Sequence, residues 1–422
     1  MIPNMAKDAN SVVVVGGGVV GLASAYYLAK AGRQVTVVER DSTLLSGCSE
    51  GNAGMIVPSH FIPLAAPGVI SQGMKWMLDP KSPFFLRPRL DFDLARWVWL
   101  FFRHANAGHV QRSEHLLRDI GLESRRLHVE LARERGFHLE ERGLLMLCQS
   151  EKGLDEEAEV AKDAIRLGLD VEIFGKDRLK DFEPGASVEA LGGVWFKQDC
   201  HLSPLDFVEA LRKAIVANGG TFLEEEVVGF AYEGEQVIGV KTATGTLVEG
   251  GKVVLAGGMA SLELARKLGL KIPMQGGKGY SLTLKEPKKA LQLCSLLKEG
   301  RVAVTPMGKT LRVAGTMEIC GSDTSLSPAR LQGIIESFCR FYPDFSPADF
   351  EGIEPWVGLR PCSPDGLPYL GRLSNQERVI VATGHSMMGL SLAPVTGWLV
   401  EKLVSGEASP IDLTALEPTR FG

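Results

Sequence analysis

The stretch SVVVVGGGVVGLASAYYLAKAGRQVTVVER, residues 11–40, decides the fold class of this chain. Its four consecutive valines, residues 12–15, form a β-branched run of the kind found in a strand buried on both faces of a parallel sheet. The run leads into three glycines, and a helix is expected from about residue 19 to 31. Residues 34–39 predict a second strand. Strand, glycine turn, helix and strand in this order are typical of a βαβ unit.

The glycines of this turn have the spacing that binds a dinucleotide pyrophosphate. Gly16, Gly18 and Gly21 give G-x-G-x-x-G, in which the first glycine permits the tight turn, the second lets phosphate approach the backbone, and the third lets the helix pack closely. Glu39 ends the second strand, where an acidic side chain can accept hydrogen bonds from a ribose. Glu39 favours FAD or NAD over NADP, although the adjacent Arg40 weakens the argument against NADP. The alternative is a glycine turn that serves only helix–strand packing.

Length and composition bound the remaining choices. A chain of 422 residues suggests two domains or one elaborated α/β unit. The formal net charge of −5, without a long basic run, predicts no nucleic-acid partner. Seven scattered cysteines without a C-x-x-C pair fit reduced thiols in the cytoplasm and predict neither a disulfide framework nor a metal site. The N-terminus lacks the apolar core of a signal peptide, and no segment approaches the roughly 20 apolar residues that span a bilayer.

One short segment, ARWVWLFF at residues 95–102, is strongly aromatic. One interpretation is a helix that packs on the protein's own core. The other is a surface that docks on a membrane, where tryptophans flanked by Arg96 and Arg103 suit the level of the lipid headgroups. The sequence leaves both interpretations open.

The rest of the chain predicts a second structural region inserted into the first. A glycine- and serine-rich loop spans residues 46–58, and a proline-rich crossover follows to residue 89. Residues 93–136 are expected to be helical, and Ser203 with Pro204 marks the start of another helix. The remaining expected elements are strands at 143–149, 193–196, 221–232, 236–242 and 246–255, an antiparallel wall within 271–316, a strand, loop and helix start at 379–389, and a helix at 390–404.

Four motifs together resemble one known family. They are GGGVVG with the later glutamate, SEGNAG followed by AAPG and KWM, QGGKGYSLT at residues 275–283, and WVGLRPCSPDGLPYLGR at 356–372 followed by TGHSMMGLSLAP. The chain is similar to the D-amino acid oxidase superfamily of FAD enzymes over residues 11–406, most closely to its bacterial D-amino acid dehydrogenase branch, and also to glycine oxidase and D-hydroxyproline dehydrogenase.

The resemblance implies an α/β fold, α+β overall, in which a Rossmann-type FAD-binding domain carries an inserted substrate domain built on an antiparallel sheet. The expected boundaries are 8–88, 200–262 and 355–422 for the discontinuous FAD-binding domain, and 89–199 and 263–354 for the substrate-binding domain. No cysteine is placed for covalent attachment, so we expect dissociable FAD.

The resemblance also implies which residues contact FAD. They come from the phosphate turn, the SEGNAG loop, the strand near residue 227, the strand end at residue 256 and the late TGHSMMG loop. The expected contacts are Gly16, Gly18, Val19, Val20, Gly21, Glu39, Arg40, Ser49, Asn52, Ala53, Gly54, Met55, Val227, Ala256, Gly257, Gly258, Gly384, His385, Met388, Gly389 and Leu390.

Three residues are candidates for the chemistry. Arg360 matches the arginine that holds the substrate carboxylate in relatives such as glycine oxidase, and a guanidinium suits that task because it pairs bidentately with a carboxylate. The alternative is a structural salt bridge. Glycine oxidase has a tyrosine where this chain has Ala303, and Tyr280 is expected to substitute for it. His385 is either an acid–base group or a hydrogen-bonding member of its loop.

The function that the resemblance implies is oxidative deamination of D-amino acids, with hydride transfer from the substrate α carbon to flavin N5 and electrons passed to a quinone or dye. A dehydrogenase of D-proline or D-hydroxyproline and an oxygen-using amine oxidase of the glycine or sarcosine type remain alternatives. So do a non-catalytic flavoprotein scaffold and an NAD enzyme. We expect a cytoplasmic protein, with peripheral contact to the inner face of the cell membrane as an alternative.

Overall fold

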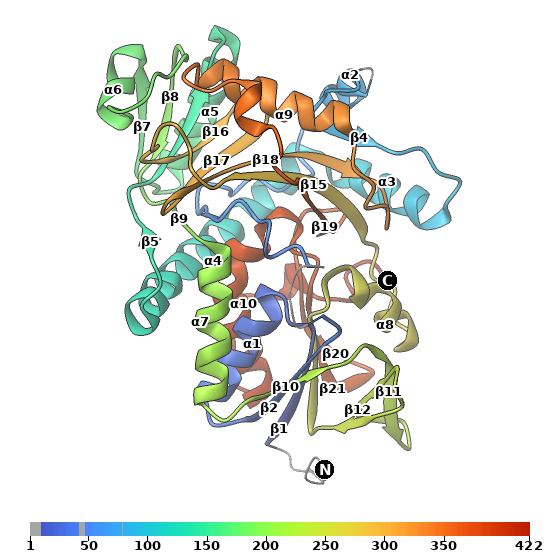
Figure 1. Ribbon diagram of the computed structural model, residues 1–422. Coiled ribbons are helices and arrows are strands. Elements are labelled where there is room, and N and C mark those ends of the chain that lie inside the picture. The colour runs from blue at the N-terminus through green and yellow to red at the C-terminus, as the bar shows by residue number, and fades with distance from the viewer. Residues whose placement is uncertain (1–9, 42–46, 78) are drawn as a thin grey trace.

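The computed structural model describes residues 10–41, 47–77 and 79–422. Within them, two large sheets lie one above the other in Figure 1, and each has helices packed against it. The first sheet contains the glycine turn, and the second contains the wall expected from the middle of the chain. This arrangement confirms the expected fold class.

The six-stranded sheet has the order β10-β2-β1-β14-β21-β20. Its first five strands run parallel, and β20 is an antiparallel edge. Strands from three separate parts of the chain therefore share one sheet. The strands are β1 (Ser11–Val15), β2 (Gln34–Glu39), β10 (Thr221–Glu224), β14 (Lys252–Leu255), β20 (Tyr369–Leu373) and β21 (Gln376–Thr383).

Helices α1 (Val19–Lys30), α4 (Ala107–Arg135), α7 (Pro204–Ala217) and α10 (Gly389–Ser405) pack together on one face of this sheet (Figure 1). The α1–α10 contact is close because a Cβ on Gly397 would lie 2.4 Å from the backbone of Ala23. The other face carries a small antiparallel sheet of β11 (Val227–Glu233), β12 (Gln236–Thr242) and β13 (Leu247–Glu249), and the short helix α8 (Ser261–Lys267).

The second sheet has the order β19-β15-β18-β17-β16-β6-β8-β7, with β4 paired to the end of β18. Most of its pairs are antiparallel, as expected, but β16–β6 and β18–β4 are parallel. Its strands are β4 (Phe84–Leu86), β6 (Leu144–Cys148), β7 (Val171–Gly175), β8 (Gly192–Phe196), β15 (Gln275–Leu284), β16 (Cys294–Leu297), β17 (Val302–Met307), β18 (Thr310–Ile319) and β19 (Trp356–Cys362).

The outer face of the second sheet is covered mainly by α9 (Pro328–Phe341) and α6 (Leu179–Phe182), whereas α5 (Glu151–Arg166) packs on the opposite face with Leu144 and Val194 (Figure 1). Helix α3 (Phe92–His104) packs near β18 and β19, and α2 (Val69–Trp76) lies beside β4. A short sheet of β3 (Met55–Ile56), β9 (Cys200–Leu202) and β5 (Leu139–Glu140) completes the described strands.

Several expected elements are divided in the structure, each at a polar or glycine signal. The helical region at 93–136 is two helices, because the Asn106 side chain accepts the His109 amide and begins α4. The strand expected at 221–232 is β10 and β11, since the chain leaves the parallel sheet at residues 225–226 and enters the small one. The strand expected at 246–255 divides at Gly250 and Gly251 into β13 and β14.

The sheets do not coincide with the domain boundaries expected from the sequence. Both β4 and β19 fall within segments assigned to the FAD-binding domain, yet both pair inside the second sheet. The reason is that the chain crosses between the sheets within the 58–89 segment and again after β19.

The aromatic segment at 95–102 has two different faces. Leu94, Trp97 and Leu100 are buried, and the first two pack against the end of the second sheet, as the core interpretation expects. Trp99 and Phe102, one helical turn apart, are 54% and 67% exposed. Among the helices of the described residues, none is long and apolar enough to cross a membrane.

Candidate active site

The expected cofactor segments meet at one edge of the six-stranded sheet. The segments at 16–21, 39–40, 256–258 and 384–390 each begin at or directly after the end of a parallel strand, namely β1, β2, β14 and β21. Val227 follows the end of β10 by three residues. The carboxyl ends of parallel strands form the edge at which α/β sheets bind nucleotides. The sequence therefore places these segments where a dinucleotide would lie.

The glycines of the first turn are required by close backbone contacts. Gly16 has φ +109, and a Cβ there would lie 2.7 Å from the Ala256 carbonyl oxygen. A Cβ on Gly21 would lie 1.9 Å from the Gly16 oxygen. A larger residue at either position would push α1 or the end of β14 out of place. The turn is thus pressed between two strand ends and the helix that follows.

Polar contacts surround this turn. The Gly17 amide donates to Glu39 Oε2 at 2.6 Å, and the Val19 amide donates to Ser49 Oγ at 3.1 Å. Helix α1 begins at Gly18 without a side-chain cap of its own. Its first amides and its dipole therefore favour an anion at this end. Arg40 is exposed beside Glu39.

The loop from Gly47 to Met55 is fastened to the second sheet. Arg312, buried on β18, donates to the carbonyl oxygens of Glu50 and Asn52 at 2.6 and 2.8 Å. A Cβ on Gly51 would lie 2.0 Å from the ring of Trp356 on β19. Two strands of the second sheet therefore hold this loop from one side. Residues 42–46, just before the loop, are outside the described residues.

The inner part of the loop is shaped by its own side chains. Asn52 Oδ1 accepts the Gly54 amide at 2.9 Å, and Gly54 has φ +76. Ala53 packs on the core of the first sheet, and Met55 begins β3. The motif SEGNAG is therefore a folded turn, and the asparagine and second glycine are the residues that form it.

The late loop ends at the start of α10. Gly384 has φ +75, Ser386 has φ +51, and α10 begins after Met388 without a side-chain cap. Its first amides are thus free of side-chain caps, in a position to favour a partial negative charge. Leu390 is buried, whereas Met387 is exposed. This helix start lies beside the end of β21, at the same edge as the phosphate turn.

His385 does not face open space at this edge. Its Nε2 is 2.9 Å from Thr396 Oγ1 within α10, and its ring is buried. Burial lowers the pKa of His385 to about 4, so the imidazole is neutral near pH 7. Of the two interpretations of this residue, the geometry favours a hydrogen-bonding member of the loop over an acid–base group.

Arg360 reaches across the second sheet. It pairs with Gly277 on β15, and its Nη1 donates to the Thr316 carbonyl oxygen on β18 at 2.8 Å, beyond β15. Among the described residues it forms no ion pair with a carboxylate. Burial lowers its pKa from the ordinary value, because the charged form loses hydration. A partly buried guanidinium of this kind is ready to bind a carboxylate from outside the chain.

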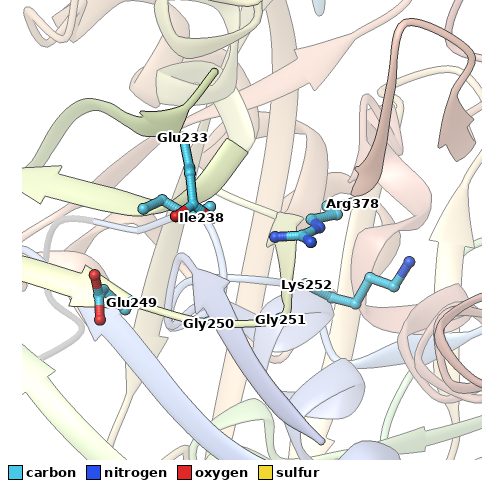
Figure 2. A pocket seen from close by; sticks show the side chains of 7 residues that line it. All are labelled: Glu233, Ile238, Glu249, Gly250, Gly251, Lys252 and Arg378. Carbon is cyan, nitrogen blue, oxygen red and sulfur yellow. The ribbon is translucent and has the colours of Figure 1, made fainter. Parts of the chain in front are cut away.

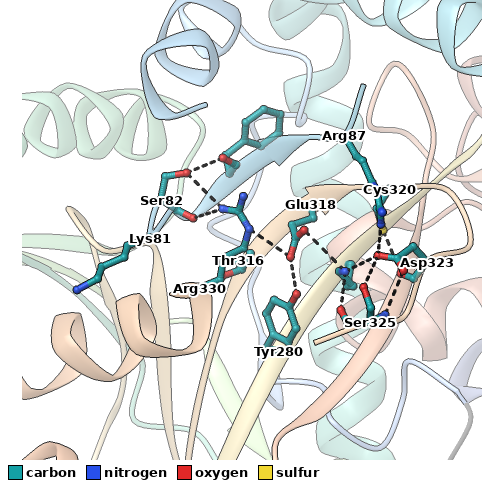
Figure 3. A network of polar contacts seen from close by, with 12 residues as sticks. Lys81, Ser82, Arg87, Tyr280, Thr316, Glu318, Cys320, Asp323, Ser325 and Arg330 are labelled. Carbon is teal, nitrogen blue, oxygen red and sulfur yellow. Dashed lines mark hydrogen bonds and ion pairs between the residues drawn. The ribbon is translucent and has the colours of Figure 1, made fainter. Parts of the chain in front are cut away.

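Tyr280 lies on the opposite face of β15. Arg360 shares its face with Gly279, while the adjacent Tyr280 packs in the outer core beneath α9. Its hydroxyl donates to Glu318 Oε1 at 2.5 Å (Figure 3). The expectation that Tyr280 assists Arg360 with the substrate is therefore corrected. The sequence does not show whether Tyr280 and Arg360 lie on the same face of the sheet, because the register between β15 and β19 cannot be read from it.

The resemblance implies a tyrosine at position 303, where this chain carries alanine. Ala303 on β17 is half-buried and pairs with Ala314 on β18. No other tyrosine on β15, β17, β18 or β19 replaces it, as the sequence of these strands shows.

Sequence reasoning missed four residues that build this site. Arg312 and Trp356 hold the 47–55 loop, while Gly279 and Thr316 contact the Arg360 guanidinium. Trp356 and Gly279 lie inside quoted motifs, but nothing in a single sequence indicates which glycine leaves space for a side chain. The signal for Arg312 is a lone arginine in an otherwise apolar strand, LRVAG.

A surface hollow elsewhere on the molecule is separate from this edge. It is lined by the start of β14 and β21 and by the small sheet, with Lys252 and Arg378 on one side and Glu249 on the other (Figure 2). It therefore lies at the amino ends of the parallel strands. The predicted cofactor residues lie at their carboxyl ends, so the hollow has no part in the candidate site.

The residues present fit FAD. The turn at Gly16 and Gly21 leaves no space for side chains, and neither α1 nor α10 is capped by the side chain of its own N-cap residue. Ser261 Oγ and Glu50 Oε2 are buried without a hydrogen-bond partner in the described chain, and both belong to segments next to the predicted contacts. Buried polar atoms are normally paired, so these two are consistent with a polar ligand at this edge.

This fold and this site define a flavoprotein oxidoreductase. The chain belongs to the family of FAD dependent oxidoreductases, DAO, whose profile matches residues 11–403. It is 34% identical over 421 residues to the D-amino acid dehydrogenase of Paramagnetospirillum magneticum, covering 97% of this chain and 98% of the relative. It is 32% identical over 427 residues to that of Bradyrhizobium diazoefficiens, with the same coverage. The glycine oxidase structure from Geobacillus kaustophilus superposes with a TM-score of 0.77 at 25% identity, covering 97% and 98% of the two chains.

Proposed function

We propose that this FAD-dependent enzyme oxidises D-amino acids to 2-oxo acids and ammonia, and passes the electrons to a quinone or another acceptor that is not oxygen. The observation that carries the proposal is Arg360, whose guanidinium lies beside the 47–55 loop without a carboxylate partner in the described chain. The D-amino acid dehydrogenases at 32% and 34% identity support the choice of substrate class.

When bound, FAD supplies the redox chemistry by accepting the substrate α-hydrogen as hydride at flavin N5. The chain's own task is to bind and orient. Arg360 would pair with the substrate carboxylate and fix the α carbon, and the start of α10 would stabilise negative charge. The substrate amine enters unprotonated, and the imino acid leaves to hydrolyse in water. Since His385 is neutral and bonded to Thr396, no protein base is assigned.

The first test is anaerobic bleaching of the flavin absorbance, screened against D- and L-amino acids, including both prolines and hydroxyproline. Bleaching by D-substrates with fast recovery on a quinone analogue and slow recovery in air is expected. Fast recovery in air with peroxide would make the enzyme an oxidase, the alternative that the glycine oxidase likeness keeps open. Preference for cyclic amines would select the D-proline or D-hydroxyproline alternative.

The second test concerns Arg360 itself. Arg360→Leu should raise the apparent Kd of the best D-amino acid in anaerobic reduction at least about tenfold, because the bidentate pair is lost. Arg360→Lys should restore only part of the substrate affinity, since an ammonium group cannot form a bidentate pair with a carboxylate. FAD content should stay as in the unchanged enzyme. An unchanged Kd in Arg360→Leu would remove the arginine from substrate binding.

We further propose that the exposed face of α3 contacts the membrane surface that holds a quinone acceptor. Phe92, Trp99 and Phe102 lie seven and three residues apart on one helix face, and Leu90 precedes them. The Arg103 guanidinium lies 4.9 Å from the centre of the Trp99 ring and brings a positive charge to this face. Aromatic side chains next to arginine suit an anionic headgroup layer. The contact would place the protein on the inner face of the cell membrane.

A further inference from the structure

The Arg360 side chain crosses β15 above a residue that has no side chain. Arg360 is on β19, its hydrogen-bond acceptor Thr316 is on β18, and β15 runs between them. A Cβ built on Gly279 of β15 would lie 2.2 Å from both Nη atoms and 2.4 Å from Cζ of Arg360. The space that any other residue would fill with its Cβ is therefore occupied by the guanidinium.

The acceptor at the far side is set by a distortion of β18. Lys278 pairs with Glu318 but Tyr280 pairs with Gly315, so Thr316 and Met317 together face Gly279 alone. This is a β-bulge, and Thr316 has φ +70, which β-branched residues rarely adopt. The bulge turns the Thr316 carbonyl toward Arg360.

Polar contacts on the opposite face hold the bulge in place. Glu318, the residue after the bulge, accepts the Tyr280 hydroxyl and lies 3.4 Å from Arg330 Nε (Figure 3). The buried Lys278 lies 3.7 Å from the same carboxylate. Within the sheet, the Met317 amide donates to the oxygen of Pro83, the residue before β4, at 2.7 Å. The side-chain contacts of Glu318 and the backbone bond of Met317 together hold the bulge despite its local strain.

We infer that Gly279 and the Thr316 carbonyl form a seat that fixes the direction of the Arg360 guanidinium, which makes Gly279 a positioning residue for the substrate carboxylate. The inference rests on the proposed role of Arg360. Of the guanidinium donors, Nη1 is engaged by Thr316, and the remaining N–H groups keep a fixed orientation toward a carboxylate. A guanidinium held in one direction loses less conformational freedom on binding a carboxylate than a freely rotating guanidinium does.

The test compares Gly279→Ala, Arg360→Ala and the double variant as FAD-loaded full-length proteins. The apparent Kd of the best D-amino acid is measured by anaerobic flavin reduction, alongside FAD content and Tm. Gly279→Ala should raise the Kd at least about tenfold with FAD content kept, because the added methyl displaces the guanidinium. The double variant should match Arg360→Ala within about twofold, since coupled residues are not additive. Gly185→Ala is the matched control, because its Cβ would meet no atom closer than 3.9 Å.

Each other outcome decides a different point. An unchanged Kd in Gly279→Ala, or penalties that add in the double variant, would overturn the seat. If Gly279→Ala does not fold, recovery of folded, FAD-containing protein in the double variant would still demonstrate the conflict between methyl and guanidinium, and failure of both would overturn it. An unchanged Kd in Arg360→Ala would overturn the proposed role of Arg360 and the seat with it.

Discussion

The Trp356 ring of the second sheet lies directly against Gly51 of the 47–55 loop, where a Cβ would come within 2.0 Å of the indole. We expect Gly51→Ala to push the loop away from Trp356 and to weaken FAD binding at least about tenfold, because the loop amides lose their alignment. Flavin release on dilution, followed by flavin fluorescence, measures this.

The matched control for that substitution is Gly229→Ala on β11, where an added Cβ has no atom within 4 Å. It should retain FAD as the unchanged protein does. Equal retention in Gly51→Ala would show that the Trp356 contact does not shape the loop.

Arg312 supports the same loop by hydrogen bonds. Arg312→Met would leave the Glu50 and Asn52 carbonyls without their donor, and an unsatisfied buried group costs about 1–3 kcal/mol. We expect the free energy of unfolding to fall by about 2–4 kcal/mol in total and FAD to dissociate faster. Urea unfolding of the FAD-loaded protein checks the first effect.

Arg126→Met serves as the comparison, since Arg126 bonds Glu123 and Glu130 on an exposed helix surface. Loss of such pairs changes stability by about 1 kcal/mol at most. If Arg312→Met is no less stable than Arg126→Met, the hydrogen bonds of Arg312 do not support the 47–55 loop.

The phosphate turn was predictable because local sequence determines it. The valine run, the glycine spacing and Glu39 lie within thirty residues, and each has one main physical explanation. The site around Arg360 was predictable only in part. Whether Tyr280 shares a face with Arg360 depends on how β15 and β19 pair, and the acceptor for Arg360 depends on a bulge in β18. Both are non-local properties, and a single sequence carries no record of strand register.

The aromatic segment at 95–102 was also predictable only in part. Its composition suggested either core or surface, and the helix uses one face for each. The three-residue spacing of Leu94, Trp97 and Leu100 was the available signal, because residues three apart on a helix share a face.

The exposed face of α3 gives a prediction about membranes. The double variant Trp99→Ser, Phe102→Ser should bind vesicles containing anionic phosphatidylglycerol about tenfold more weakly, since two large apolar groups no longer enter the interface. Flotation with vesicles measures binding. Activity with a soluble dye acceptor should stay unchanged, because neither side chain belongs to the site.

Leu205→Ser, Leu247→Ser is the control for the membrane test, as these side chains are 46% and 48% exposed on other elements. Vesicle binding equal to that of the unchanged protein is expected for it. Equal losses in both double variants, or no loss in either, would mean that α3 is not the docking face.

A buried histidine predicts the acid sensitivity of the fold. His128 on α4 packs against Phe207, and its Nε2 has no hydrogen-bond partner in the described chain. Burial lowers the pKa of His128 to about 4, from an ordinary value near 6.5. Between these values the unfolded chain binds the proton and the folded chain does not, so this histidine makes stability fall as pH drops from about 6.5 to 4. The slope is about 1.4 kcal/mol per pH unit for one proton.

His128→Phe removes that proton uptake while keeping an aromatic ring. We expect the loss of stability between pH 7 and pH 5 to become smaller by about 1–2 kcal/mol in urea unfolding, whatever the variant does to stability at pH 7. A His128→Phe variant that loses as much stability on acidification as the unchanged protein would show that His128 is protonated in the folded state.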